Sequence, residues 1–377
     1  MSASPVLEGS ACLCEAPEPV SHRWNNFSKG SRWSPDGSVA LAVSDDAMVR
    51  LYKVPDDPSG QNSSGPTPTG ADPAALKPYV EVAEGGPVLD FCFFPGFTQG
   101  CPASCCFITS SQDHPIHLRD ALEGSLRNSY RPYNQVDEVC HAFSLCFSAD
   151  GSKILGGFPQ YIRVFDLQRP GRQVEDWLLS TKKGRGQKGI IGAVAASPDR
   201  PGLYAAGSYN RSICLYQQGN RGKPVAHLAD NGKDHAMGGV TQLMFSGEWL
   251  LLSGHRQDGF IRAWDLRMAG DREQEALLHR FPRPAYTHQR FSFGVQDDLL
   301  TTGDDSGNIL LYSLSSLQEV GRIAGAHSRP CVAAELRPGS QASPGQGLLL
   351  SSSGSRHFPD YDVDSPEPSR SPSPQQV

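Results

Sequence analysis

The chain repeats one short pattern along most of its length. Each copy has an apolar stretch ending in a turn like Ser-Pro-Asp-Gly, then small residues ending in Ser or Gly, a tight polar turn, and a stretch that closes on an aromatic residue. The clearest copies are WSPDGSVALAVSDDAMVRLY (33–52), FSADGSKILGGFPQYIRVFD (147–166), ASPDRPGLYAAGSYNRSICLY (196–216), FSGEWLLLSGHRQDGFIRAWD (245–265) and VQDDLLTTGDDSGNILLY (295–312). A weaker copy spans 93–120. Self-similarity at a fixed period indicates a repeat architecture.

The closing residues of the copies set the period. They are Tyr52, Arg119, Phe165, Tyr216, Trp264 and Tyr312. After a first gap of 67 residues, the gaps are 46, 51, 48 and 48 residues. Three or four short strands repeated at this period are typical of β-propeller blades. A seventh copy begins at Pro330, so the sequence predicts an all-β, seven-bladed propeller over 21–359.

The best-formed copy carries the hydrogen-bonding residues of a WD40 repeat. Its predicted buried tetrad is His235, Ser253, Asp258 and Trp264. An Asp in a tight turn can accept hydrogen bonds from backbone and imidazole, and an indole N–H can donate to the same network. Ser, His and Asp also suggest a catalytic triad. Because the same frame recurs with substitutions in other copies, we favour the structural interpretation.

Three segments fall outside the repeats. The N-terminus (1–20) and the Ser/Pro-rich tail (360–377) are acidic and predicted to be disordered, and 55–78 is a low-complexity insertion between the third and fourth strands of the first blade. The tail has candidate phosphorylation sites before proline at Ser365, Ser371 and Ser373. Since the last copy lacks an outer strand, Val20–Phe27 is the predicted strand that closes the ring.

Composition excludes several classes of protein. The formal net charge of −6 argues against a protein that coats polyanions indiscriminately, although each tail contributes −3 and the body sums to zero. No apolar run is long enough to span a bilayer and no secretory signal opens the chain, which predicts a nuclear or cytosolic protein. The ten cysteines show no paired CxxC motif, so we expect thiols and neither a metal site nor a cofactor.

One loop concentrates positive charge on the face where two kinds of loop should gather. It follows the outer strand of the third blade and contains Lys182, Lys183, Arg185 and Lys188. Its glycines allow close approach to a phosphate, and each cation can replace a counterion. A solvated flexible loop is the alternative interpretation.

The turns between second and third strands add aromatic and basic side chains to the same face. They are His114, Phe158, Tyr161, Tyr209, Arg211, His255 and Arg256. Aromatic and guanidinium planes beside a basic loop suit unpaired RNA bases, which can stack and offer their edges. The candidate base or sugar contacts are Tyr209, Arg211 and Arg256.

Segments between the repeat anchors resemble one family. They are SSQDHPIHLRDALEGSLRNSYRPYNQVDE (110–138), HAFSLCFSADGSKILGGF (141–158), RVFDLQRPGR (163–172), GSYNRSICLY (207–216), WDLRMAG (264–270) and HQRFSF (288–293). In these segments the chain is similar to the telomerase Cajal body protein 1 family of WD40-repeat proteins. The likeness runs from about Phe27 to Phe358.

The resemblance implies a non-enzymatic adaptor. Members bind the Cajal-body box of small Cajal-body RNAs and of telomerase RNA, and they direct these H/ACA ribonucleoproteins to Cajal bodies and telomeres. It therefore implies a nuclear, Cajal-body location with a cytoplasmic pool, and telomerase as a partner. Because closing the ring is non-local, assistance from a chaperonin is also expected.

The sequence departs from the pattern at Arg119, where the repeat expects Trp, so we expect the second blade to lack the indole donor. Two other functions stay open. One is a protein-only scaffold whose RNA association is indirect. The other is a propeller hydrolase, which would need convergent carboxylates or a metal-ligand set on the axial face.

Overall fold

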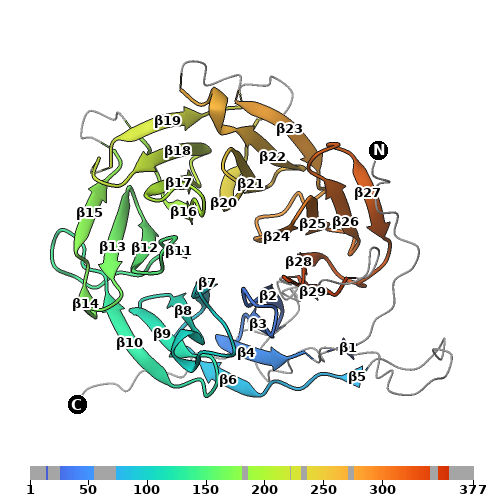
Figure 1. Ribbon diagram of the computed structural model, residues 1–377, viewed down its shortest axis with the longest axis horizontal. Coiled ribbons are helices and arrows are strands. Elements are labelled where there is room, and N and C mark those ends of the chain that lie inside the picture. The colour runs from blue at the N-terminus through green and yellow to red at the C-terminus, as the bar shows by residue number, and fades with distance from the viewer. Residues whose placement is uncertain are drawn as a thin grey trace, which may run out of the picture.

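The protein forms radial β-sheets around one axis. The computed structural model describes residues 14–15, 26–54, 74–180, 186–220, 222–230, 236–270, 276–339 and 347–355. These ranges contain β-strands, two 3-10 helices, η1 (Pro102–Ser104) and η2 (Leu266–Met268), and no α-helix. Within them, no helix is long and apolar enough to cross a membrane. The predicted all-β propeller class is confirmed (Figure 1).

Blades 1 to 3 each begin with their innermost strand. Blade 1 consists of β2 (Ser28–Trp33), β3 (Val39–Ser44), β4 (Met48–Lys53) and β6 (Val80–Ala83). Blade 2 consists of β7 (Val88–Phe93), β8 (Cys106–Ser111), β9 (Ile116–Asp120) and β10 (Leu126–Arg131). Blade 3 consists of β11 (Ser144–Phe147), β12 (Lys153–Phe158), β13 (Tyr161–Asp166) and β15 (Glu175–Leu178).

Blades 4 to 6 repeat this order. Blade 4 consists of β16 (Ile191–Ala196), β17 (Leu203–Ser208), β18 (Ser212–Gln217) and β19 (Pro224–Leu228). Blade 5 consists of β20 (Gly239–Ser246), β21 (Leu250–Arg256), β22 (Phe260–Asp265) and β23 (Leu277–Pro282). Blade 6 consists of β24 (Phe293–Gln296), β25 (Leu299–Gly303), β26 (Ile309–Ser313) and β27 (Glu319–Ile323).

The prediction of seven blades is wrong for the described residues, which form six complete blades. A seventh sheet has two strands, β28 (Cys331–Leu336) and β29 (Leu349–Ser353). No alternating apolar segment follows β29 in the sequence, and Pro359 lacks the N–H that a ladder requires. The sheet fills the gap between blades 6 and 1, where the backbone N–H of Trp33 donates to Glu335 Oε2 over 3.0 Å.

Short strands join segments that are distant in the chain. β14 (Gly171–Arg172) adds a fifth strand to blade 2 by pairing with β10. β1 (Cys14–Glu15), within the N-terminal acidic segment, pairs with β5 (Ala74–Ala75), at the end of the predicted insertion. Leu76, also inside the predicted insertion, packs against the cluster of Trp33, Ala40 and Tyr52. Most of Val20–Phe27, like residues 360–377, lies outside the described residues, so ring closure by that segment stays a prediction.

Apolar side chains hold neighbouring blades together. Each blade boundary from blade 1 to blade 6 contains its own buried cluster, such as Leu251 and Trp264 of blade 5 with Ala205 and Leu215 of blade 4. The closing residues all lie on third strands. Full burial of one apolar side chain in these clusters contributes about 1.5–3 kcal/mol.

Loops from strand four to the next strand one meet the turns between strands two and three on one face, which we call the upper face. Backbone hydrogen bonds join them, for example Gln160 N to Gly189 O, Tyr209 N to Ile190 O and Gln257 N to Thr287 O. The predicted gathering of these loops is therefore present.

Candidate nucleic-acid interface

The WD40 network of blade 5 is buried and structural. Trp264 Nε1 donates to Ser253 Oγ over 2.8 Å, so the serine hydroxyl donates in turn to His255 Nε2 over 2.8 Å. His255 Nδ1 then faces the Gly238 carbonyl at 3.2 Å. Burial, together with Arg262, lowers the pKa of His255 to about 3. This neutral imidazole and the serine beside it are at most 2% exposed, so no substrate reaches them.

The imidazole in the network belongs to His255. His235 lies outside the described residues, so its place in the tetrad stays a prediction. Asp258 accepts hydrogen bonds from the Gly238 N–H and the Arg262 guanidinium, at 2.8 and 2.6 Å.

Blade 2 replaces the WD40 network with an ionic one. Glu84, whose side chain is fully buried, accepts from Thr109 Oγ1 and Arg119 Nε, both at 2.8 Å, and pairs with His117 Nδ1 at 2.9 Å. Arg119, at the position of the missing Trp, therefore has a buried carboxylate as its acceptor. The sequence could have indicated this network, because Glu84 stands just before the first strand of blade 2, at the position where the repeat has a His.

The basic loop lies partly outside the described residues. Lys182, Lys183 and Arg185 belong to that part, so their contribution stays a prediction. Lys188 is exposed on the upper face. Its carbonyl accepts from Ser208 Oγ, and this bond holds the loop against the turn that carries Tyr209 and Arg211.

Tyr209 and Arg256 form one unit. The Arg256 guanidinium lies over the Tyr209 ring, 4.1 Å from its centroid, and both side chains are half-buried. Arg211 is exposed at the tip of the same turn, with φ 59°. The structure thus brings together Lys188, Tyr209, Arg211 and Arg256 at the junction of blades 3, 4 and 5.

The other residues expected on this face differ in how far their side chains are exposed. His114 and Tyr161 are half-buried, whereas Phe158 is fully buried and His255 belongs to the blade 5 network. The prediction that the side chains of Phe158 and His255 belong to the surface of this face is therefore wrong. Strand alternation turns both side chains into the blade interior, although they lie next to a turn.

Sequence reasoning missed two arginines near the axis. Arg290 Nη1 donates to Asp90 Oδ1 over 2.8 Å, although the two residues are 200 positions apart and belong to opposite sides of the ring. Burial by itself lowers the pKa of Arg290, but the attraction to Asp90 outweighs it, and the pKa is raised. Arg283 is fully buried and donates to the carbonyls of His255 and Phe291, at 2.8 and 3.3 Å. No local pattern marks the Arg290–Asp90 contact, because the closure of the ring creates it.

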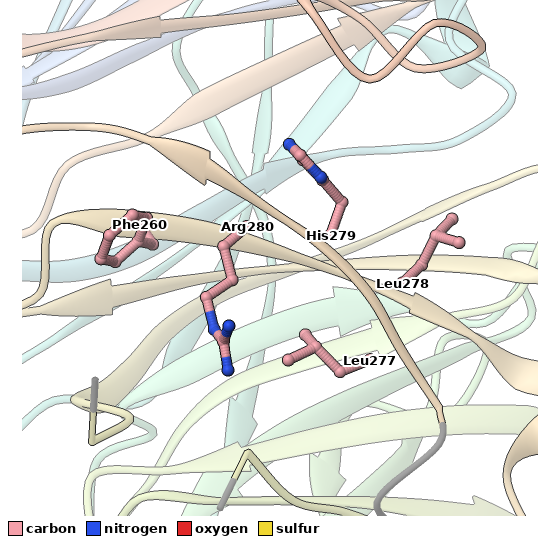
Figure 2. Close-up of a pocket in the computed structure, with 5 residues that line it drawn as sticks. All are labelled: Phe260, Leu277, Leu278, His279 and Arg280. Carbon is pink, nitrogen blue, oxygen red and sulfur yellow. The ribbon is translucent and has the colours of Figure 1, made fainter. Parts of the chain in front are cut away.

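Among the described residues, no group of three or more His, Cys, Asp or Glu side chains could hold a metal ion. A pocket of about 370 Å³ lies on the outer rim of blade 5, lined by Phe260, Leu277, Leu278, His279 and Arg280 (Figure 2). Arg280 is already paired with the buried Asp230 at 2.6 Å. Because the pocket lies on the outer rim, it is separate from the candidate interface on the upper face.

Comparison with known proteins gives the relationship. No family model matches the chain. Telomerase Cajal body protein 1 of Mesocricetus auratus is 34% identical over 370 residues, covering 94% of this chain and 65% of the relative. The Mus musculus protein of that name is 36% identical, covering 90% of this chain and 61% of the relative. The Drosophila melanogaster homolog is 32% identical, covering 89% and 58%.

The chain spans about three-fifths of the length of these curated relatives. Over about nine-tenths of its length, this chain is homologous to proteins named telomerase Cajal body protein 1 in mammals and Drosophila.

Proposed function

We propose that the protein is an RNA-binding adaptor whose upper face holds an unpaired segment of a small noncoding RNA. In this proposal Lys182, Lys183, Arg185 and Lys188 contact phosphates, and Tyr209, Arg211 and Arg256 contact bases or sugars. The rigid ring holds these side chains in place, phosphate contacts supply affinity, and base contacts supply selectivity.

The stack of Arg256 on Tyr209, beside exposed Lys188 and Arg211, is the observation that carries this proposal. Neither Lys188 nor Arg211 forms an ion pair with any described residue, so both charges are available to a ligand. A cation held over an aromatic ring next to unpaired basic side chains is the combination that single-stranded nucleic-acid sites use.

The finer proposal follows the names of the relatives. We infer that the RNA is one bearing a Cajal-body box, in small Cajal-body RNAs or telomerase RNA, within an H/ACA ribonucleoprotein. The adaptor would then act in the nucleus and its Cajal bodies, with telomerase as one cargo. The opposite face of the ring is left open to other proteins.

The test is RNA recovery after crosslinking in cells. Reversing the charge of Lys182, Lys183, Arg185 and Lys188 to Glu should abolish recovery of small RNAs at physiological salt. The matched control reverses four basic residues away from the upper face. Unchanged recovery of RNA from the first variant would refute the assignment of the site.

A protein-only scaffold is the second candidate. Val136 and Tyr286, on two loops of the upper face, are 71% and 70% exposed, and exposed apolar side chains of this kind favour protein contacts. In that case RNA association would be indirect. Partner recovery that is insensitive to RNase, together with no direct RNA crosslink, would favour the scaffold over the adaptor.

A further inference from the structure

Three side chains converge at the upper end of the central opening. Arg290 precedes β24 and reaches across the axis to Asp90 on β7, the innermost strand of blade 2. Arg283 donates to the carbonyls of His255 and Phe291, so the backbone positions of Arg256 and Arg290, each next to one of these acceptors, lie close together. Arg256 lies on the Tyr209 ring. Blades 2, 4, 5 and 6 therefore contribute to one location. Figure 1 shows the innermost strands of these blades around the centre of the ring.

Two glycines on innermost strands make room for this group. A Cβ on Gly192 of β16 would lie 2.1 Å from the Tyr209 ring. A Cβ on Gly239 of β20 would lie 2.9 Å from Arg256 Nε and from the Tyr209 carbonyl. Neither glycine has a positive φ, so the requirement is for space and not for backbone conformation. The Tyr209 ring is thus enclosed between Gly192 and Arg256, and Arg256 is the plane nearer to a ligand.

Arg283 holds the two other arginines in position. Its fully buried guanidinium donates to the carbonyl of His255, the neighbour of Arg256, and to that of Phe291, the neighbour of Arg290. No described carboxylate forms an ion pair with it. A buried cation is costly unless its hydrogen bonds are satisfied, and these two acceptors satisfy both Nη atoms of Arg283 while its Nε has no partner among the described residues. Both of its acceptors flank the arginines at the axis, which accounts for its position.

Arg290 has unused hydrogen-bonding capacity. Its Nη1 donates to Asp90 and, at 3.5 Å, to the Leu89 carbonyl. Its Nε is buried and has no hydrogen-bond partner among the described residues. The Arg290 side chain is nevertheless 25% exposed, so a ligand can reach part of it. Asp90 offsets the charge of Arg290, so Arg256 and the neighbouring Arg283 leave this location with a net positive charge.

From this geometry we propose that Tyr209, Arg256 and Arg290 form an axial subsite for a single unpaired nucleotide. The base stacks on Arg256, Arg290 donates to an acceptor on the same nucleotide, and the net positive charge attracts the phosphodiester. Arg283 and Gly192 are positioning residues. The inference rests on the proposed function and assigns one nucleotide of the RNA to the centre of the ring.

The test uses the full chain and a fluorescent RNA hairpin with the Cajal-body box in its loop. Each loop nucleotide is made abasic in turn, and affinity is measured by anisotropy at fixed salt. For the wild-type protein one abasic position should weaken binding roughly tenfold or more. For Arg256→Ala that position should lose its effect, because the stacking plane is gone.

Two variants keep the test specific. Arg200→Ala removes a similar stack, with Arg200 4.7 Å from the Trp249 ring in the turns of the opposite face, and should leave the abasic profile unchanged. The double variant Asp90→Asn/Arg290→Gln removes both charges together, so neither is left without its partner. It should melt near the wild-type temperature and bind the hairpin more weakly.

The outcomes separate the two proposals. If the hairpin binds but the abasic profile is the same in wild type and Arg256→Ala, the axial subsite is refuted and the adaptor function stands. Equal effects of Arg256→Ala and Arg200→Ala would also refute the subsite. If the wild-type protein does not bind the hairpin at all, the proposed function fails and the subsite fails with it.

Discussion

Replacing Glu84 with Gln should destabilise blade 2 by about 3 kcal/mol at neutral pH. Burial raises the pKa of Glu84, but hydrogen bonds from His117, Arg119 and Thr109 outweigh it and lower the pKa from 4.5 to about 2. Each pKa unit corresponds to ~1.36 kcal/mol of interaction with the charged form. With an unfolding entropy of ~2.1 cal/mol/K per residue over roughly 300 residues, this is a decrease in Tm of ~5 °C.

The pH dependence gives a second signature. Because the folded pKa lies below the unfolded one, the carboxylate contributes fully above pH 4.5 and its contribution is lost as the pH falls towards 2. The difference in unfolding free energy between wild type and Glu84→Gln should therefore fall to less than half by pH 3.

Scanning calorimetry from pH 7 to pH 3 measures both effects. The control is Glu81→Gln, which removes the same charge from a carboxylate that is half exposed and pairs with Arg50 at 2.9 Å. It should cost no more than about 1 kcal/mol. Equal losses for the two variants, or a Glu84→Gln deficit that does not change with pH, would refute the reasoning.

Three further predictions follow from the networks and the charged face. Trp264→Phe should lower the free energy of unfolding by about 1–3 kcal/mol, through the lost hydrogen bond to Ser253, and leave RNA selectivity unchanged; calorimetry and anisotropy check this, and lost binding with normal stability would contradict it. Burial lowers the pKa of His255 from 6.5 to about 3, so between these pH values the imidazole is protonated in the unfolded chain and neutral in the folded one. The free energy of unfolding should therefore fall by about 1.4 kcal/mol per pH unit as the pH decreases from 6.5 towards 3. His255→Gln should flatten that slope in thermal melts across the same range, and an unchanged slope would contradict the assignment. Lys188→Ala should weaken RNA binding at every sequence tested and reduce the salt slope by about one counterion, whereas a loss confined to one RNA would argue against a phosphate contact.

Local patterns predict the repeated part of this fold and little of what joins the blades. The closing residues Tyr52, Phe165, Tyr216, Trp264 and Tyr312 lie on third strands as the period requires. Strand and turn chemistry act over a few residues, so they can be read directly from the chain. The number of complete blades could not be read in this way, because the last copy has the first two strands and no recognisable remainder.

The candidate interface shows the same division. Lys188, Tyr209, Arg211 and Arg256 belong to loops whose positions follow from the repeat, so sequence reasoning could place them on one face. Arg290 and Asp90, 200 residues apart, meet only because the ring closes. His255 looked like a loop residue because it stands one position before Arg256, and strand alternation sends the two side chains in different directions.

The most direct test of the account is sequencing of RNA crosslinked to the protein in its own cells, with crosslinked amino acids mapped by mass spectrometry. The account predicts a set of small RNAs that carry the box, joined to the protein at Arg256 or Tyr209 and at the loop containing Lys188. A background of messenger RNAs, or crosslinks confined to other faces of the ring, would contradict it.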